Sequence, residues 1–435
     1  MPAFKQKLTK TGARAALLAS AIAAMLAISG VGASSASAAC TGTIVGQGAS
    51  LQNVAQNEIW IPHFNKEVCE GAEGSKTRKP EYISTGSGPG LKAWGFTAME
   101  GVNKERHFIG TDDAPAAAQI TTAREQANNA NVLVVPVAQT AIAVVANPPA
   151  SCTITEITNK DLENAMDGTI TKWSELSTAS GAGCTGSLTR VVRAEGSGTT
   201  FQFKNYLSKI SANLPCTTEG KTKWSELQEI GTEEKPNITW PTCAGKTAPV
   251  TGAGGSGVVK AVTATANNGR IGYAALPDAK NPANGTPVIL KVQNAEAGGE
   301  PTGFAAPGVE EEESGKKGNA NCAKAVYAVP AAGQTSGSGE NVDWSGVFGG
   351  NPKIAGTTYP ICTLTYDLAW DDYKTAGYTS GEEVGKSVTH YIHTIVTNPT
   401  VPTVKKWYAA LPAGTGESSN VQMAAEYASL QIQMP

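Results

Sequence analysis

The sequence predicts an α/β fold in which mostly parallel strands alternate with helices. Short runs rich in β-branched residues are repeatedly followed by a glycine-containing turn and then by a stretch with helical periodicity. This order is typical of parallel sheets, because two parallel strands need a long crossover connection, usually a helix. At about 150 residues per domain, the 435 residues are enough for two or three lobes with cores of their own.

Three cycles of strand, turn and helix follow one another along the chain. In the first, an amphipathic helix has Leu51, Val54, Ile59 and Trp60 at its inward positions. Later cycles start near residue 154 and at the glycine-rich turn 252–257. The expected strands are 43–45, 82–83, 132–135, 141–145, 189–192, 271–273 and 359–364, and the expected helices are 51–64, 91–99, 161–166, one from 199, 258–266 and 382–397.

The first 38 residues have the features of an export signal peptide. Four cationic residues precede an apolar run from Ala15 to Ile28, and Ala36, Ser37 and Ala38 form a small-residue cleavage site. The apolar run is shorter than the ~20 residues of a membrane span. We therefore expect an exported protein, located in the periplasm, at the cell surface or outside the cell.

The composition excludes two classes of protein. Glycine and proline, 48 and 24 of 435 residues, stay below the share typical of low-complexity chains. The chain has 34 Lys and Arg residues and 37 Asp and Glu residues. Removal of the four cationic residues of the leader leaves a net charge of about −7. Nothing in this charge indicates nucleic-acid binding. A stretch at about 296–342 is read as an exposed insertion, because it contains four consecutive glutamates and a Gly/Ser-rich run.

The eight cysteines are scattered without the C-x-x-C spacing of zinc or redox sites, which favours disulfides in an oxidising compartment. The simplest connectivity is sequential. A competing interpretation makes the first cysteine, which follows the cleavage region, a lipid anchor. The sequential pairs are Cys40 with Cys69, Cys152 with Cys184, Cys216 with Cys243, and Cys322 with Cys362.

Three strand exits lead into a glycine with Ser or Thr at a helix start. They are residues 48–50, 86–88 and 196–199. Glycine lets the backbone approach a ligand closely, and a first helical turn presents unpaired N–H groups and a positive dipole end. One such turn is more often a simple N-cap. Three of them that converge would form a site for a tetrahedral anion.

Arg193 strengthens this hypothesis, because it ends a strand three residues before Gly196. A guanidinium there offers a fork of donors to an oxyanion, and Glu195 can hold it by an ion pair. The alternative is an ordinary surface Arg–Glu pair beside a turn, which contributes little to stability.

The string VVRAEGSGTTF at 191–201 resembles the arginine–acid–glycine–serine–glycine–threonine signature of bacterial phosphate-binding proteins, which feed ABC-type phosphate importers. Further segments resemble the same family in the same order, across nearly all of the chain beyond the leader. These segments are GQGAS at 46–50, STGSGPG at 84–90, GTDDAP at 110–115, DGTITKW at 167–173, NNGRIGY at 267–273, VDWSGVF at 342–348 and EYASL at 426–430.

The resemblance implies a two-lobed periplasmic-binding-protein fold of type II, each lobe a mostly parallel sheet flanked by helices, with the ligand in the cleft between them. By motif order, lobe one comprises 39–143 and 284–435, and lobe two comprises 144–283. The family usually has Asp where this chain has Glu195, and often an aromatic residue where it has Leu51. The phosphate-binding residues implied are Ser50, Leu51, Ser87, Asp113, Arg193, Glu195, Ser197, Gly198 and Thr199.

Asp113 also has a physical argument of its own. A carboxylate among anion-binding donors repels the ligand unless the ligand brings a proton, which phosphate does near neutral pH and sulfate does not. We therefore interpret Asp113 as a filter against sulfate. The alternative is a helix N-cap at Asp113 or Asp112, since Ala-Pro follows.

The function expected from this resemblance is extracytoplasmic capture of inorganic phosphate and its delivery to a membrane permease and ATPase. The expected protein is a monomer that needs neither metal nor cofactor and is no enzyme. His390 and His393 share a helix spacing but lack a third ligand nearby. The alternatives are a binding or sensing protein for another oxyanion, and a phosphatase that uses the same anion site.

Overall fold

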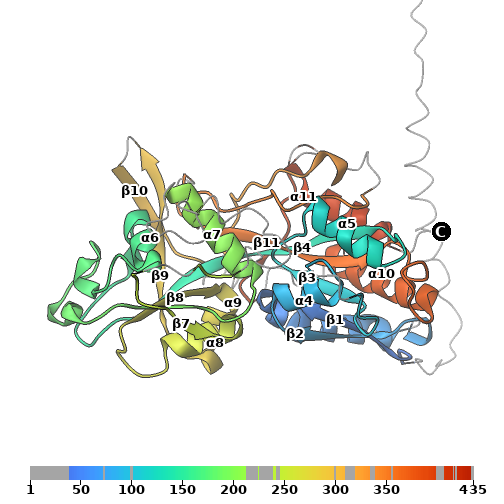
Figure 1. Cartoon of the computed structure of the whole chain (residues 1–435), viewed down its shortest axis with the longest axis horizontal. Coiled ribbons are helices and arrows are strands. Elements are labelled where there is room, and N and C mark those ends of the chain that lie inside the picture. The colour runs from blue at the N-terminus through green and yellow to red at the C-terminus, as the bar shows by residue number, and fades with distance from the viewer. Residues whose placement is uncertain are drawn as a thin grey trace, which may run out of the picture. The chain divides into compact units, whose positions relative to one another are not determined.

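The computed structural model confirms the α/β prediction (Figure 1). It describes residues 39–71, 74–97, 101–211, 224, 239–241, 245–297, 300–308, 319–333, 339–353, 356–397, 406–414, 416 and 419–432. The predicted signal peptide, Cys216, Cys243 and the four glutamates 310–313 lie outside these described residues. None of the helices in the described ranges combines the length and the apolar character needed to cross a membrane.

Two groups of parallel strands are joined through two antiparallel strands. On one side β1 pairs in parallel with β2 and β3, and on the other β6 pairs in parallel with β7 and β8. Strands β11 and β4 lie between the groups and run antiparallel to their neighbours. Along this path the order is β2 (Lys79–Ser84), β1 (Thr43–Gly48), β3 (Phe108–Thr111), β11 (Cys362–Trp370), β4 (Val132–Asn147), β8 (Arg270–Ala275), β6 (Thr189–Arg193) and β7 (Val250–Gly252).

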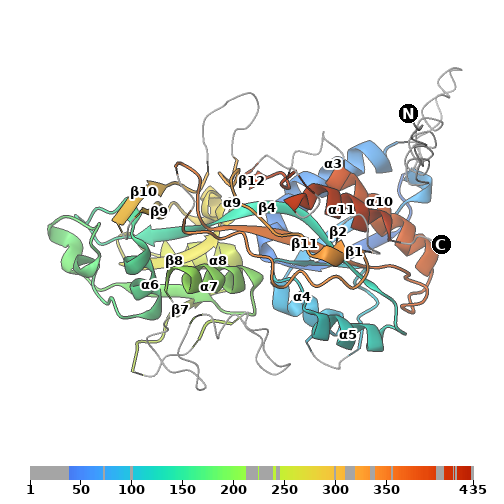
Figure 2. The same ribbon diagram turned by 90° about the horizontal axis from the view of Figure 1, so that it is seen from above.

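Helices pack beside both groups of strands. Figure 2 shows α6, α7 and α8 beside the group that contains β8, and α4, α5, α10 and α11 beside the group that contains β1. The α-helices beyond residue 80 are α4 (Ser87–Ala93), α5 (Ala117–Gln126), α6 (Asn159–Asp167), α7 (Gly198–Ile210), α8 (Gly254–Val262), α9 (Leu276–Ala279), α10 (Gly381–Thr397) and α11 (Val421–Leu430). The remaining short elements are η4 (Gly74–Lys76), β5 (Glu156–Ile157), η5 (Trp173–Glu175), η6 (Ala182–Thr185), η8 (Pro282–Asn284), β9 (Val288–Ala297), β10 (Glu300–Ala305), η9 (Ala331–Gly333) and β12 (Tyr408–Ala409).

Strand β4 belongs to both groups. Its first part pairs with β11 and its last part, from Ile142, pairs with β8. The sequence predicted two strands here, on either side of Pro136, but the structure has one continuous strand. A shift of register opposite Pro136 accommodates the missing N–H group. The predicted lobe boundary at 143/144 therefore falls inside β4, and it remains a prediction.

The first helical stretch runs from Ser50 to Cys69 and confirms the predicted inward positions. Leu51, Val54, Ile59 and Trp60 are all buried. The stretch changes repeatedly between tight, regular and wide turns, and Pro62, which cannot donate a backbone hydrogen bond, lies within it. Its pieces are η1 (Ser50–Gln52), α2 (Asn53–Ala55), η2 (Gln56–Trp60), α3 (Ile61–Phe64) and η3 (Asn65–Cys69).

The six cysteines within the described residues all form disulfides, and they pair in sequence order as predicted. The bonds are Cys40–Cys69, Cys152–Cys184 and Cys322–Cys362. The sulfur of Cys40, which a lipid anchor would need, is bonded to Cys69.

The region after residue 284 differs in part from the expected exposed insertion. Strand β9 pairs with β4 and β5, and β10 pairs with β9. Further along, Cys322 and Tyr327 are buried. These described parts are folded against the rest of the chain, because their apolar side chains complete the core. The predicted lobe boundary near 284 is not decided by this pairing.

A polar network lies buried beneath the first helical stretch. Gln52 donates to Thr365 Oγ1 at 2.8 Å, and Gln56 donates to Gln52 Oε1 at 3.0 Å. The carboxylate of Asp367 accepts longer bonds from Gln56, at 3.3 and 3.4 Å. Burial raises the pKa of Asp367 to about 7, more than the glutamine hydrogen bonds lower it.

Asp367→Asn should make the free energy of unfolding less dependent on pH. Because the folded state raises the pKa of Asp367, it binds the proton more tightly than the unfolded chain does. The stability of the wild type therefore falls as the pH rises from about 4 to about 7. Asparagine does not ionise, so the variant should lose less stability over this range, by up to a few kcal/mol. Urea unfolding at several pH values measures the slope, and identical slopes would contradict the assignment.

Candidate functional site

The predicted site residues meet where strands of the two groups end and helices begin. Ser50 follows β1, Ser87 begins α4 after β2, and Arg193 is the last residue of β6. Direct hydrogen bonds connect the two groups of strands at this point. Gly88 N donates to Gly196 O at 3.1 Å, for example. The glycine-containing turns that the sequence singled out thus lie against one another, as parallel strand ends at one edge predict.

Three serine hydroxyls at these turns share one arrangement. Ser50 Oγ accepts from Gly255 N at 3.3 Å, Ser87 Oγ accepts from Asp112 N at 3.2 Å, and Ser197 Oγ accepts from Thr200 N at 3.2 Å. A hydroxyl that accepts from a backbone N–H keeps its own hydrogen to donate. Each serine is therefore fixed in place and can still donate to an anion. Leu51, next to Ser50, has a buried side chain, and its carbonyl accepts from Tyr408.

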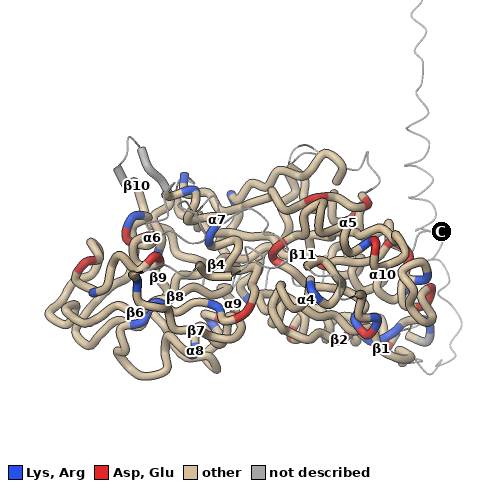
Figure 3. The backbone as a smooth tube through the Cα atoms, in the orientation of Figure 1, with Lys and Arg blue, Asp and Glu red and all other residues tan. Residues whose placement is uncertain are grey.

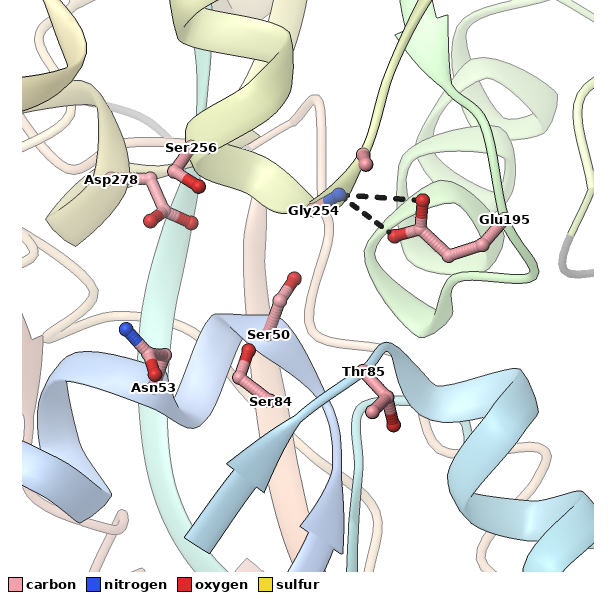
Figure 4. Close-up of a pocket in the computed structure, with 9 residues that line it drawn as sticks. Ser50, Asn53, Ser84, Thr85, Glu195, Gly254, Ser256 and Asp278 are labelled. Atoms are coloured by element: carbon pink, nitrogen blue, oxygen red, sulfur yellow. Dashed lines mark hydrogen bonds between the residues drawn. The ribbon is translucent and has the colours of Figure 1, made fainter.

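Arg193 is buried and held by Glu195. Its Nε donates to Glu195 Oε1 at 2.7 Å, and Nη2 contacts the same oxygen. The second partner of Glu195 is Gly254 N at the start of α8, at 3.0 Å (Figure 4). The carboxylate thus fixes the guanidinium, and the alternative of an exposed surface pair is wrong, because only 2% of the Arg193 side chain is exposed.

The first turn of α7 approaches the aspartates through Gly198. A Cβ atom at this position would lie 2.6 Å from Asp113 N and 2.7 Å from Ser87 Oγ, distances that no real side chain adopts. Thr199, the next residue, donates from Oγ1 to Asp112 Oδ2 at 2.9 Å. The N–H groups at the start of a helix have no acceptor within the helix, so this turn presents them where the two groups of strands meet.

The two aspartates differ in their partners. Both oxygens of Asp112 accept hydrogen bonds, from Thr199 and from Thr365. Asp113 Oδ1 is buried and accepts no hydrogen bond from the described residues. Neither residue is the cap of α5, whose N-cap is Ala116, so the N-cap alternative is wrong.

Burial raises the pKa of both carboxyl groups. Asp112 reaches about 6, because the Thr199 hydrogen bond and Arg193 offset part of the effect of burial. Asp113 reaches about 7, with Asp112 adding to the effect of burial and Lys204 opposing it. An acid with such a pKa exchanges its proton near neutral pH. Sequence reasoning missed that Asp112 contacts Thr199, although the adjacent aspartates of GTDDAP were a visible signal.

A cavity of about 290 Å³ adjoins Ser50 and Glu195 (Figure 4). Sequence reasoning missed its second carboxylate, Asp278, which lies in α9 outside every motif. The cavity lining does not include Ser87, Asp113, Arg193, Ser197, Gly198 and Thr199, although Arg193 donates to the lining residue Glu195. The residues that line it are Ser50, Asn53, Ser84, Thr85, Glu195, Ala253, Gly254, Ser256 and Asp278.

The family model of the PBP superfamily domain matches residues 33–316. This match covers more than half of the chain. The chain belongs to this superfamily. A curated phosphate-binding protein from an unknown prokaryotic organism is 28% identical over 362 residues, covering 78% of this chain and 89% of that protein.

Solved structures of phosphate-binding proteins have the same fold. The phosphate-bound high-affinity periplasmic protein PfluDING has a TM-score of 0.59 at 20% identity, over 90% of this chain and 99% of its own. A human phosphate-binding apolipoprotein has a TM-score of 0.59 at 19% identity, over 89% and 93%. The phosphate-binding protein of Stenotrophomonas maltophilia has a TM-score of 0.55 at 20% identity, also over 89% and 93%. The chain thus has the two-lobed periplasmic-binding-protein fold that the sequence predicted.

Gly198→Ala should disrupt the contact between α7 and the aspartates. Its Cβ would overlap the backbone of Asp113, so either the fold loses about 1–3 kcal/mol of stability or the lobes move apart. Denaturant unfolding measures the first effect, and small-angle X-ray scattering measures the second. Gly346→Ala is the matched control, because a Cβ there meets nothing within 4 Å. A variant with unchanged stability and unchanged scattering would contradict the packing described.

Proposed function

We propose that this protein binds inorganic phosphate in the cleft between its two lobes and delivers it to an ABC-type importer. The observation that carries the proposal is the contact between the turns that supply three serine hydroxyls, the first turn of α7 and the Arg193 guanidinium. These groups supply many hydrogen-bond donors at the cost of one formal positive charge. A small oxyanion is the ligand that such a set of donors fits.

Phosphate is favoured over sulfate by Asp113. Its Oδ1 accepts no hydrogen bond from the described residues, so it can accept one from the ligand. Monobasic and dibasic phosphate both carry a P–OH hydrogen, whereas sulfate carries none at neutral pH. A sulfate ion beside this oxygen would leave two acceptors facing each other without a hydrogen. The phosphate-binding relatives support the same ligand.

Binding is coupled to closure of the lobes in this proposal. A ligand that contacts Ser50 and Ser87 in one lobe and Arg193 and α7 in the other favours the closed form over the open one. We place the protein outside the cytoplasm as a monomer, with the permease and ATPase of the importer as its partners. It acts as a binding protein and not as an enzyme, as its relatives do.

Arg193→Ala should weaken phosphate binding by tenfold to more than a hundredfold. The variant loses charge-assisted hydrogen bonds worth about 1.5–3 kcal/mol each and leaves Glu195 without its cation. Isothermal titration calorimetry with phosphate measures the loss. Arg78→Ala is the matched control, because it removes an arginine paired with Glu383 at the protein surface. Unchanged affinity in Arg193→Ala would place the anion site elsewhere.

Asp113→Asn should reduce the discrimination between phosphate and sulfate. The asparagine amide can donate a hydrogen to sulfate, so sulfate affinity should rise relative to phosphate affinity by at least tenfold. Competition titrations with both anions on wild type and variant give the ratio. If the wild type binds sulfate as tightly as phosphate, the filter is disproved and a general oxyanion-binding protein is the better description.

A further inference from the structure

Asp278 is a buried carboxylate in the wall of the cavity that sequence motifs do not explain. Only 5% of the residue is exposed, and its Oδ2 has no hydrogen-bond partner among the described residues. Figure 4 shows the carboxylate directed toward the space between α8 and the segment that carries Ser50 and Asn53. A buried acceptor without a donor costs free energy, which a ligand that supplies a hydrogen would recover.

The carboxylate is held against the first turn of α8 by a glycine. A Cβ atom at Gly255 would lie 2.1 Å from Asp278 Oδ2, so only glycine leaves room for this oxygen. The amide of Gly255 is already used, because it donates to Ser50 Oγ. Asp278 thus lies close to Ser50, a predicted phosphate-binding residue, and has an oxygen to which no described residue donates a hydrogen bond.

The charged groups around Asp278 place it at the edge of the anion site. Arg193 lowers its pKa and Asp112 raises it, so both act on Asp278 electrostatically. Glu195 lines the same cavity, and Asp278 in turn raises the pKa of the Tyr408 phenol. Lys280, two residues further along, stacks on Trp407 at 4.6 Å from the ring centre. In Figure 3 Asp and Glu positions are visible near α9 and near β11.

We propose that Asp278 is a second acceptor for the hydrogens of the ligand, so that the site binds phosphate in its monobasic form, with two P–OH groups. One P–OH donates to Asp113 Oδ1 and the other to Asp278 Oδ2. Both oxygens are buried and accept no hydrogen bond from the described residues, a property that they share with Asp167 Oδ2 in α6. Asp112 is not available in the same way, because Thr199 and Thr365 already donate to its oxygens. This inference rests on the proposed function and specifies the protonation state of its ligand.

The proposal has a consequence for proton balance. Above about pH 7 free phosphate is mainly dibasic, and Asp278, whose pKa burial raises to about 7, is mainly ionised. A complex with two P–OH groups must then take up one proton from solution for each phosphate bound. Linkage makes the affinity of the wild type fall by up to about tenfold per pH unit in this range. Asparagine at position 278 removes the charge that requires this proton.

The test is calorimetry of phosphate binding at about pH 8 in buffers of different ionisation enthalpy, on wild type and Asp278→Asn. The wild type should take up close to one proton more than the variant, and its affinity should fall more steeply between about pH 7.5 and 8.5. Equal proton uptake and equal slopes would overturn the inference while leaving phosphate binding intact. Absence of phosphate binding in the wild type would instead overturn the proposed function.

Asp167→Asn is the matched control. Asp167 is also buried, has an Oδ2 without a partner and has a raised pKa, but it lies in α6 and does not line the cavity. This variant should keep the proton uptake and the slope of the wild type. Asp278→Ser provides a second substitution in case asparagine impairs folding, which thermal unfolding reveals. A Ser variant that is folded and retains the wild-type proton uptake would equally disprove the role of Asp278.

Discussion

The cleft depends on the balance of charge around one guanidinium. Arg193 is paired with Glu195, and its field also acts on Asp112 and Asp278. Burial opposes ionisation of both aspartates and is the largest cause of their raised pKa values. Because the carboxylates around this cation outnumber it, the proposed function requires an anion that brings protons with it. In this proposal the carboxylates restrict the charge and protonation state of the ligand, whereas the hydrogen-bond donors alone would accept any small oxyanion.

The hydrogen-bond donors near these carboxylates are mostly neutral groups. Serine hydroxyls and helix N–H groups carry partial charges, so they can gather at one point without repelling one another or needing counterions. Their close approach depends on glycine. Gly198 lies where any side chain would strike Asp113, and Gly86, with φ of 99°, has the Glu195 side chain 3.0 Å from the position of a Cβ. An acidic protein can in this way hold an anion by local geometry, without a broad basic surface.

Local patterns predicted most of the fold and much of the site. Helical periodicity identified the buried Leu51 and Trp60, and the glycine–serine turns identified Ser50, Ser87 and Arg193's loop. The prediction placed two strands on either side of Pro136, whereas the structure has the single strand β4. The sequence does not show this, because a shift of register in the partner strand β11 accommodates the missing N–H group of Pro136. Asp278 was out of reach, since its place beside Gly255 arises only when α9 packs against α8. Contacts between segments far apart in sequence leave no local pattern to read.

Thr199 links the protonation of the cleft to the contact between the lobes. Its single hydroxyl hydrogen is donated to Asp112, across the two groups of strands, and this bond lowers the pKa of Asp112. An anion that takes this hydrogen leaves Asp112 with Thr365 as its remaining side-chain donor, so the proton affinity of Asp112 rises. The same event replaces a direct bond between the groups by one through the ligand. In the proposed function, ligand binding would therefore change the contact between the two groups of strands and the hydrogen bonds of Asp112 in one exchange of partners, separately from the proton uptake attributed to Asp278.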